Sequence, residues 1–441
     1  MRLHQLQALM ADKGCSRILV KELAANDNSK NQVYLGGNFE AVNCFPNLII
    51  NPDDTGTHGP VFKAPLSYIW VDATGQEYPA PATQLILYPQ YPEVRVSGFL
   101  KGCSHAPSEL MRGRLDGRVL FLGVRADGRV LGHVVAPDDE LAIEFRARQD
   151  FEPLGIFRIV PVRAEVPGSR RTRLLAELRR VHGLSWIDSK RLLSDGSVTA
   201  YEAPNGGGYT LEAEIGIRPN GFSEPDFDGW ELKQHAVNRL DACDSGVLTL
   251  MTPEPTGGVY SEFGPISFVR SYGHTDRKGR PDRMNFAGIH KTGVRQPTTH
   301  LEMSLRGYDI ERGRITEGSG AIVLTADDGV VAASWPFAGL MTHWNRKHNM
   351  AAYIPSISRI KPDQTMKQYH YGRLVRLGEG TDFLMFLSAI AEGVIYYDPG
   401  IELTMASSAT PRLHRRSQFR IRSRDLNCLY RRFCQVDVLE G

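Results

Sequence analysis

The stretch that decides the fold is Pro225-Asp-Phe-Asp-Gly-Trp-Glu-Leu-Lys233, an acidic turn followed by alternating apolar and charged residues. An Asp-Gly pair in this setting predicts a hairpin, with residues 230–233 on its return strand. Successive side chains of a strand point to opposite faces, so Glu231 and Lys233 share one face while Trp230 and Leu232 face the core. The stretch therefore predicts a strand that presents an acid and a base together.

Four ionisable side chains in this region could support metal-dependent hydrolysis of a phosphodiester. Such hydrolysis needs charge neutralised on the transition state and a nucleophilic water, which Mg²⁺ held by carboxylates supplies. Asp226 and Glu231 are the expected metal ligands, and the Lys233 ammonium can orient the attacking water. Glu212, expected on a helix beside the sheet, could bind a second metal ion or help to position the water. The alternative is a solvated strand with an Asp-Gly turn and a surface ion pair.

The bulk composition is that of a globular protein with two domains. A chain of 441 residues exceeds one ordinary core. Its hydrophobic share of 41% and charged share of 23%, with 43 Gly and 26 Pro, predict mixed α/β structure with many turns. The net charge of +2 means that a nucleic-acid surface would need local clustering of positive charge.

The sequence also bounds the compartment. No apolar run approaches the roughly 18 residues of a membrane span. The six cysteines form no CxxC pair, and the N-terminus lacks a signal peptide. We therefore expect reduced thiols in a cytoplasmic protein with no membrane partner.

The chain changes character between residues 166 and 167, where we expect the domain boundary. Before it, short apolar runs alternate with turns, as in 118–124 and 130–135, which predicts a β-rich barrel or sandwich. After it, Ser169 can cap a helix that Gly183 ends, and strand-like and helix-like runs then alternate as in an α/β domain. The other expected strands are 17–20, 67–71, 84–88, 245–251, 321–324 and 394–397, and the other expected helices are 338–345 and 382–391.

Flanking motifs connect the acidic stretch to a known family. The motifs are Tyr209-Thr-Leu-Glu212, residues 225–233, Thr252-Pro-Glu-Pro-Thr-Gly-Gly258 and Gly393-Val-Ile-Tyr-Tyr-Asp-Pro-Gly400. In this order they resemble the MvaI/BcnI family of restriction endonucleases, within the PD-(D/E)xK superfamily and close to its MutH-like branch. The resemblance spans most of the chain from Arg170 onward, and it implies an α/β restriction-endonuclease-like catalytic domain over residues 167–441.

The resemblance also implies roles for the ionisable residues. Glu212, Asp226, Glu231 and Lys233 match the acidic and lysine positions of the family's active site, with the three acids as metal ligands. The implied cofactor is Mg²⁺, with Mn²⁺ as an expected substitute. Asp228 departs from the family pattern, because it adds a carboxylate inside the turn, and we expect it to be solvated. By analogy the domain would act as a monomer with one active site, nicking one DNA strand and then the other.

A dense run of arginines near the C-terminus is a candidate DNA surface. Eight arginines lie within residues 412–432, and arginine binds phosphates and can read guanine in the major groove. Phe419 and Ile421 alternate with Arg420 and Arg422, which predicts a strand with one basic face or, alternatively, a solvated edge strand kept soluble by charge. The turn before this strand resembles the family's recognition loop, and its expected DNA contacts are Arg412, His414, Arg415 and Arg416.

Two further segments could face DNA. The segment His343-Trp-Asn-Arg-Lys-His348 combines aromatic, amide and basic groups that suit bases and phosphates. Its expected contacts are His343, Arg346, Lys347 and His348, and its histidines lack the companions of a zinc site. Trp344 suits a core position as well as an interface. The basic run 274–283 is either a DNA contact or a solvated loop.

The N-terminal half resembles a second DNA-binding fold. Lys21-Glu-Leu-Ala-Ala-Asn-Asp-Asn-Ser-Lys30 and Tyr91-Pro-Glu-Val-Arg-Val-Ser-Gly-Phe99 are similar to the N-terminal effector domain of the EcoRII family. This resemblance implies a β-rich pseudobarrel DNA-binding domain over residues 1–166. Arginine bidentate to guanine and glutamate accepting from cytosine would read a C/G-rich site, while the alternative is a turn with a cross-strand ion pair. The expected contacts are Lys21, Asn26, Asn28, Lys30, Glu93 and Arg95.

Together the two resemblances imply a type II restriction endonuclease. It would cleave double-stranded DNA at a short CCNGG-type site, such as CCWGG, while the N-terminal domain binds a second copy of the site in a type IIE arrangement. Two alternatives are a modification-dependent endonuclease and a DNA-binding regulator that keeps the fold without cleaving. Competent residues at all four active-site positions argue against the regulator.

Overall fold

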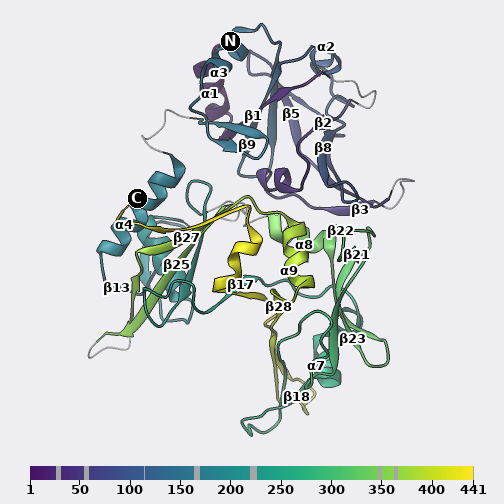
Figure 1. The fold of residues 1–441 in the computed structure, drawn as a ribbon, viewed down its shortest axis with the longest axis vertical. Helices are drawn as coiled ribbons and strands as arrows, with labels where there is room; N and C mark the ends of the chain where they lie inside the picture. The colour runs from purple at the N-terminus through teal and green to yellow at the C-terminus, as the bar shows by residue number, and fades with distance from the viewer. Residues whose placement is uncertain are drawn as a thin grey trace. The chain divides into compact units, whose positions relative to one another are not determined.

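The computed structural model describes residues 1–25, 31–53, 59–113, 115–162, 169–218, 226–345, 350–361 and 366–440. The chain divides into two units (Figure 1). Unit 1 comprises Met1–Asp53, Val61–Ala176 and Asn220–Gly229, and unit 2 comprises Asp54–Pro60, Glu177–Pro219 and Trp230–Gly441. The predicted boundary between residues 166 and 167 lies outside the described residues.

Unit 1 is built on two β-sheets. The seven-stranded sheet has, in spatial order, β11 (Pro153–Leu154), β12 (Phe157–Val160), β1 (Cys15–Leu23), β9 (Arg118–Arg125), β10 (Val130–Val135), β5 (Tyr68–Val71) and β6 (Glu77–Pro79). The five-stranded sheet has β2 (Val33–Tyr34), β8 (Glu93–Ser97), β7 (Gln84–Tyr88), β4 (Val61–Pro65) and β3 (Asn51–Asp53). Strands β5 and β10 pair in parallel, and the other neighbours in both sheets pair antiparallel. The prediction that this half is rich in β-structure is confirmed.

The predicted hairpin between residues 118 and 135 is present. Val124 of β9 lies opposite Val130 of β10. Gly128 in the connecting turn has a φ of 90°, a backbone conformation that favours glycine. Its N–H donates to the carbonyl oxygen of Arg125, which closes the turn. The Asp-Gly signal therefore placed both strands and the turn correctly.

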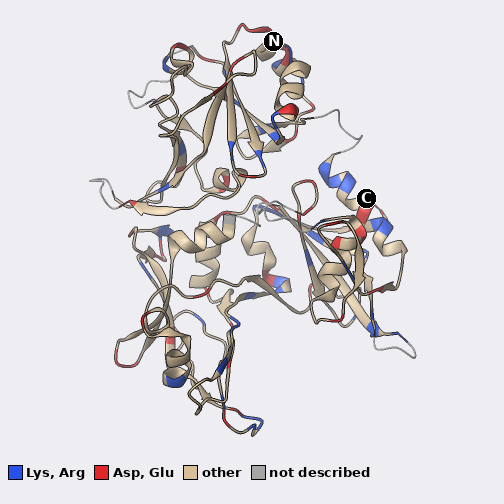
Figure 2. Cartoon of the chain, turned by 180° about the vertical axis from the view of Figure 1, so that it is seen from behind, with Lys and Arg blue, Asp and Glu red and all other residues tan. Residues whose placement is uncertain are grey.

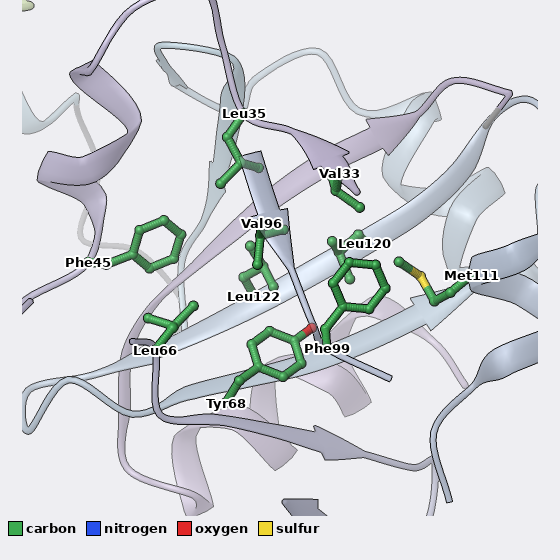
Figure 3. Close-up of a pocket in the computed structure, with 10 residues that line it drawn as sticks. All are labelled: Val33, Leu35, Phe45, Leu66, Tyr68, Val96, Phe99, Met111, Leu120 and Leu122. Carbon is green, nitrogen blue, oxygen red and sulfur yellow. The ribbon is translucent and has the colours of Figure 1, made fainter. Parts of the chain in front are cut away.

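Two apolar layers hold unit 1 together. Helices α1 (Leu3–Asp12) and α3 (Glu140–Ala147) bury Leu6 and Phe145 in one core with Phe121 of the seven-stranded sheet. A small cavity lined by ten side chains lies between the two sheets, where Leu120 of β9 faces Val96 of β8 (Figure 3). The remaining helical segments of unit 1 are η1 (Glu40–Cys44) and α2 (Ser108–Arg112). In the five-stranded sheet, β4 and β8 alternate buried and less buried residues, as expected for a sheet with one face on the core, whereas β9 and β10 of the seven-stranded sheet are buried almost throughout.

The main sheet of unit 2 contains the strand that follows the acidic turn of residues 226–229. Its spatial order is β13 (Ile187–Asp188), β26 (Lys367–Tyr371), β25 (Met350–Ile360), β27 (Leu374–Glu379) and β32 (Arg432–Asp437). Strand β16 (Glu231–Ala236) pairs in parallel with the long strand β25. The predicted strand that begins beside Trp230 is therefore joined to the most buried strand of this sheet.

Smaller sheets make up the rest of unit 2. They are, in spatial order, β14 (Lys190–Leu192) with β15 (Val198–Ala200); β17 (Val247–Met251), β31 (Phe419–Arg422) and β28 (Tyr396–Tyr397); β18 (His274–Thr275), β19 (Arg283–Ala287), β29 (Gly400–Thr404) and β30 (Arg412–His414); β20 (Leu301–Arg306), β23 (Ala321–Ala326) and β24 (Val331–Pro336); and β21 (Tyr308–Asp309) with β22 (Arg314–Ile315).

The helices begin and end where local signals predict. The hydroxyl oxygen of Ser169 accepts the N–H of Thr172 at 3.1 Å, and α4 (Arg170–Gly183) follows it and ends at the predicted glycine. Asp382 caps α9 (Phe383–Ala391) in the same way. The other helical segments are α5 (Gly206–Ile215), α6 (Val259–Glu262), α7 (Gly264–Tyr272), α8 (Phe337–Asn345) and η2 (Ser423–Leu429). Mixed α/β structure in the C-terminal region is confirmed.

Two global expectations can be compared with the structure. Within the described ranges, every helix falls short of the length and apolar character that a bilayer crossing requires. All six cysteines are described, and no disulfide joins any two of them. The thiols at Cys15 and Cys44 are buried, and burial raises their pKa values to about 11 and about 12. These two cysteines are protonated packing residues at neutral pH.

Candidate active site

Strand β16 holds the predicted acid and base side by side. The Lys233 Nζ donates to Glu231 Oε1 at 3.2 Å, and the two side chains are 17% and 6% exposed. Trp230 and Leu232 are buried, as the alternation predicts. Because the pair is largely buried, the alternative of a solvated surface ion pair is wrong.

Strand β25 lies beside this pair. In the parallel register Glu231 lies opposite Ala351 and Lys233 lies opposite Tyr353. The Tyr353 hydroxyl is 2.7 Å from the Tyr430 hydroxyl, and both rings are buried. Burial raises the pKa of each tyrosine, and the charge of Glu231 raises both further. The two hydroxyls therefore stay protonated and bring no competing negative charge to the site.

A buried arginine lies one strand further along the same sheet. Arg376 of β27 lies opposite Tyr353, and only 4% of its surface is exposed. Its guanidinium donates to the backbone carbonyl oxygen of Ser423 at 2.6 Å and also to the Ser423 hydroxyl. A buried positive charge, held through its two terminal nitrogens, thus lies on the strand next to Tyr353. Sequence reasoning missed Arg376 and Tyr430, although an arginine inside the apolar run 374–377 is a visible signal.

His235 follows Lys233 on the same face of β16 and is not available for acid–base chemistry. Its Nε2 lies 3.0 Å from the carbonyl oxygen of Cys243. Burial lowers its pKa to about 4. The imidazole is therefore neutral at physiological pH and serves packing.

Glu212 lies on a helix beside the sheet, as predicted. Helix α5 begins with three glycines, and a Cβ at Gly207 would lie 2.8 Å from the Gln234 side chain of β16. The Tyr371 hydroxyl donates to the Gly207 carbonyl oxygen at 2.7 Å. Glycine thus allows α5 to approach the strand closely, and Glu212 follows in the next turn. Burial raises the pKa of the Tyr371 hydroxyl, and the negative charge of Glu212 raises it slightly further.

The turn before β16 has a specific backbone. Asp228 and Gly229 have φ values of 49° and 90°, the two positive values that a type I′ turn requires. Arg173 Nε and NH2 lie 2.7 and 2.5 Å from Asp228 Oδ2. Asp228 is exposed, as expected, and its carboxylate also forms an ion pair with Arg173. Asp226 is half-buried in the bend before this turn and falls within the unit 1 segment.

The predicted metal ligands were tested against the geometry. Across the described ranges, no three side chains of His, Cys, Asp or Glu lie close enough together to hold a metal ion. The set of Glu212, Asp226 and Glu231 therefore stays a prediction. The predicted ligands are carboxylates, the hard oxygen donors that Mg²⁺ prefers.

The candidate DNA contacts near the C-terminus lie on an exposed surface. Arg412, His414, Arg415 and Arg416 are all exposed. Strand β30 pairs with β29, and the Arg416 side chain lies so close to Gly400 that a Cβ there would be 2.5 Å from its Nε. The motif 393–400 thus helps to place this surface. Basic and acidic residues are interspersed over both units (Figure 2), so a local cluster such as this one matters more than the net charge.

Arg420, one of the eight arginines, forms an ion pair on a strand that lies inside its sheet. Strand β31 lies between β17 and β28, so the alternative of an edge strand is wrong. Phe419 and Ile421 are fully buried, as the alternation predicts. Arg420 NH1 lies 2.6 Å from Asp398 Oδ2, which commits its charge to the second half of the motif 393–400.

The two other candidate segments are only partly described. His343 is exposed in the last turn of α8, whereas Trp344 is a core residue whose ring lies 4.8 Å from Phe386. The predicted contacts Arg346, Lys347 and His348 lie outside the described residues. In the run 274–283, Arg280 donates to Asp276, and this hydrogen bond holds the pKa of the Asp276 carboxyl well below its usual range.

The predicted contacts of unit 1 that the structure describes lie on two different strands. Arg95 Nε and Glu93 Oε1 are 2.9 Å apart on β8, and Arg95 NH1 donates to Gln32 at 3.2 Å. The ion pair of the alternative is present, but it joins two residues of one strand and does not cross between strands. Lys21 of β1 is half-buried, and burial lowers its pKa. Asn26, Asn28 and Lys30 lie outside the described residues.

Comparison with known proteins identifies the family. The model of the MvaI/BcnI restriction endonuclease family matches residues 175–430, more than half of the chain. The chain belongs to the MvaI/BcnI restriction endonuclease family. The match includes Glu212, Asp226, Glu231 and Lys233, and it confirms the resemblance found in the sequence. It begins at residue 175, so the resemblance of the N-terminal half to the EcoRII effector domain stays a prediction.

Solved structures of MvaI align with this family member. The restriction endonuclease MvaI in complex with its cognate DNA substrate is 18% identical, with a TM-score of 0.44, and the alignment covers 62% of this chain and 100% of MvaI. MvaI in the absence of DNA is 16% identical, with a TM-score of 0.34 and the same coverage. No curated protein matches the chain.

Proposed function

We propose that this protein is a type II restriction endonuclease that hydrolyses double-stranded DNA with Mg²⁺ at a short CCNGG-type site. Membership of a family of restriction endonucleases supports site-specific DNA cleavage. The observation that carries the proposal is the buried pair of Glu231 and Lys233 on β16. An acid and a base kept together in a largely buried place are costly to maintain, which points to a catalytic use.

The residues of this chain suggest how the reaction is supported. A bound Mg²⁺ would neutralise charge on the phosphate and supply a nucleophilic water, with Asp226, Glu231 and Glu212 as its carboxylate ligands. Lys233, oriented by Glu231, can donate to the attacking water or to a phosphate oxygen on which charge develops. The protonated Tyr353 and Tyr430 leave Glu231 as the negative group beside Lys233. Burial strengthens each of these interactions because the local dielectric is low.

The partner in this proposal is double-stranded DNA. The MvaI relative has been solved with its cognate DNA substrate, which supports the same class of partner here. The exposed basic turn 412–416 offers groups for bases and phosphates. The proposal includes action as a monomer and a second DNA copy bound by the N-terminal domain, both by analogy with the two resembled families.

Plasmid cleavage tests the catalytic assignment. Wild-type protein with Mg²⁺ is expected to give discrete linear fragments, and Lys233→Ala is expected to slow cleavage by about 10²–10³-fold, the usual effect of losing one transition-state donor. Lys101→Ala, at an exposed lysine of unit 1, is the matched control and should cleave like wild type. Equal cleavage by wild type and Lys233→Ala, or none by either, would overturn the assignment.

The same substrates test specificity. Run-off sequencing of the cleaved ends should return one short C/G-rich site. Matched methylated and unmethylated plasmids separate a restriction enzyme from a modification-dependent nuclease. Cleavage confined to modified DNA would replace the proposal with the second class.

A further inference from the structure

An arginine beside α5 is stacked on an aromatic shelf. The guanidinium of Arg191, on β14, lies 4.8 Å from the centre of the Tyr209 ring on α5. The Tyr209 ring in turn packs edge-on against Tyr201, with ring centres 4.9 Å apart. Arg191 is half-buried in this arrangement. The Tyr209 ring thus holds the guanidinium through a cation–π contact, and Tyr201 supports that ring.

The neighbouring cations are neutralised, whereas Arg191 is not. Lys190 Nζ lies 2.5 Å from Glu214, and Arg180 lies 2.9 Å from Glu177. In the part of the chain that the structure describes, no carboxylate forms an ion pair with Arg191, and its buried Nε donates no hydrogen bond. A partly desolvated positive charge is therefore left to meet an anion from outside the protein.

The position of Arg191 is tied to the catalytic helix. The Thr210 hydroxyl accepts the Lys190 N–H at 3.1 Å and donates to the Lys190 carbonyl oxygen at 3.3 Å, which fastens β14 to α5. Tyr209 and Glu212 are three residues apart on α5, so they lie on one side of the helix with a rise of about 4.5 Å between them. Arg191 is thus held within one helical turn of a predicted active-site acid.

We propose that Arg191, on its shelf of Tyr209 and Tyr201, binds a backbone phosphate of the DNA close to the scissile one. The inference rests on the proposed function, because it takes Glu212 as part of the active site. The planar guanidinium fork matches two phosphate oxygens, and a contact of this kind is independent of base sequence.

The salt dependence of DNA binding tests this contact without any cleavage. Fluorescence anisotropy with a labelled duplex in metal-free buffer gives the affinity at a series of salt concentrations. Arg191→Ala should weaken binding about tenfold, as expected for a charged hydrogen bond. It should also reduce the slope of log K against log salt by about 1, the share of one phosphate contact. Arg191→Gln, which keeps most of the volume and removes the charge, should reduce the slope equally.

Matched variants separate this contact from a general loss of charge. Arg239→Ala removes an exposed arginine of unit 2 that is already paired with Asp241 at 2.5 Å, so its slope should equal that of wild type. Tyr209→Phe keeps the ring, so its slope of log K against log salt should equal that of wild type. Tyr209→Leu removes the ring under Arg191, so its slope should fall nearly as much as that of Arg191→Ala. Melting temperatures report whether each variant is folded.

The outcomes distinguish the two proposals. If wild type binds DNA and both Arg191 variants keep its slope, the phosphate contact is wrong while the proposed function stands. If wild type neither binds nor cleaves DNA, the proposed function itself fails. A loss of slope in Arg239→Ala equal to that in Arg191→Ala would also overturn the inference, because any arginine would then do.

Discussion

Two strands carry the same pattern of acid, apolar residue and base, and they differ in how deeply the pattern is buried. On β8, Glu93 and Arg95 form an ion pair at 2.9 Å, with side chains 24% and 30% exposed. On β16, Glu231 and Lys233 form one at 3.2 Å, with side chains 6% and 17% exposed. In both strands the acid and the base are two residues apart, so their side chains lie on one face and form an ion pair. The neighbouring strands determine how exposed that ion pair is to solvent.

The difference in burial changes what each pair can do. Beside β8, Arg95 reaches Gln32 and the face of Tyr88, and water still screens its charge. Beside β16, Lys233 lies next to buried Tyr353, so water competes little for its ammonium. A surface pair contributes little to stability, whereas a buried pair costs desolvation and acts strongly on anything placed beside it. The buried pair is therefore the one suited to chemistry.

The largest test of this comparison removes the acid from each pair. Glu231→Gln keeps the shape and deletes the charge that orients Lys233 and offers a hard oxygen ligand. Single-turnover cleavage at saturating Mg²⁺ should fall by about 10²–10³-fold or more. Glu93→Gln, the matched change on β8, should slow cleavage far less, since Glu93 is a predicted DNA contact and takes no part in the chemistry at β16.

Two results would break the comparison. Similar losses of rate in both variants would mean that burial does not separate the catalytic pair from the surface pair. A full rate in Glu231→Gln would remove the acid from the mechanism. Melting temperatures of both variants exclude unfolding as the cause of a loss.

A second test concerns the two tyrosines, Tyr353 and Tyr430, that lie near the buried pair. Tyr353→Phe and Tyr430→Phe each leave the other hydroxyl buried without its partner, which should lower the free energy of unfolding by about 1–3 kcal/mol. The double variant removes both hydroxyls, so it should recover most of that loss. Urea denaturation of the four proteins measures the cycle.

An exposed hydroxyl is the control for the tyrosine cycle. Tyr201 donates to Asn205 at 3.0 Å in an exposed setting, so Tyr201→Phe should change the free energy of unfolding by less than about 0.5 kcal/mol. Additive losses in the double variant of Tyr353 and Tyr430 would show that the two hydroxyls do not stabilise each other. The packing of the two rings alone would then account for the contribution of Tyr353 and Tyr430 to stability.

Local patterns in the sequence predicted much of this architecture. The strand from Glu231, the helix that carries Glu212, the cap at Ser169 and the turn at Gly128 each depend on residues close in the chain. For the same reason the pairing of Glu231 with Lys233 could be foreseen, because two residues on one strand face must meet. Family motifs then gave these residues an expected role.

Long-range packing limited the rest of the prediction. Tyr353 and Arg376 reach the site through strand pairing, and Tyr430 through the contact of its hydroxyl with that of Tyr353. These contacts join distant parts of the chain, which no local pattern encodes. The fate of Trp344 was open because an aromatic residue suits both a core and an interface. The ion pair of the exposed Asp228 was not predicted, since its partner, Arg173, lies 55 residues away in the sequence.

The smallest expected effect concerns the stability of the β8 pair itself. A double-mutant cycle with Glu93→Gln and Arg95→Gln should give a coupling energy below about 1 kcal/mol, because both side chains remain partly solvated. Raising the ionic strength should shrink it further, since screening acts on exposed charges. Unit 1 would have to be followed by a probe of its own, such as Trp70 fluorescence during urea denaturation. A coupling energy well above about 1 kcal/mol that does not change with salt would show that the β8 pair behaves as a buried pair. The difference between the β8 and β16 pairs would then come from the neighbouring tyrosines and Arg376, and not from burial.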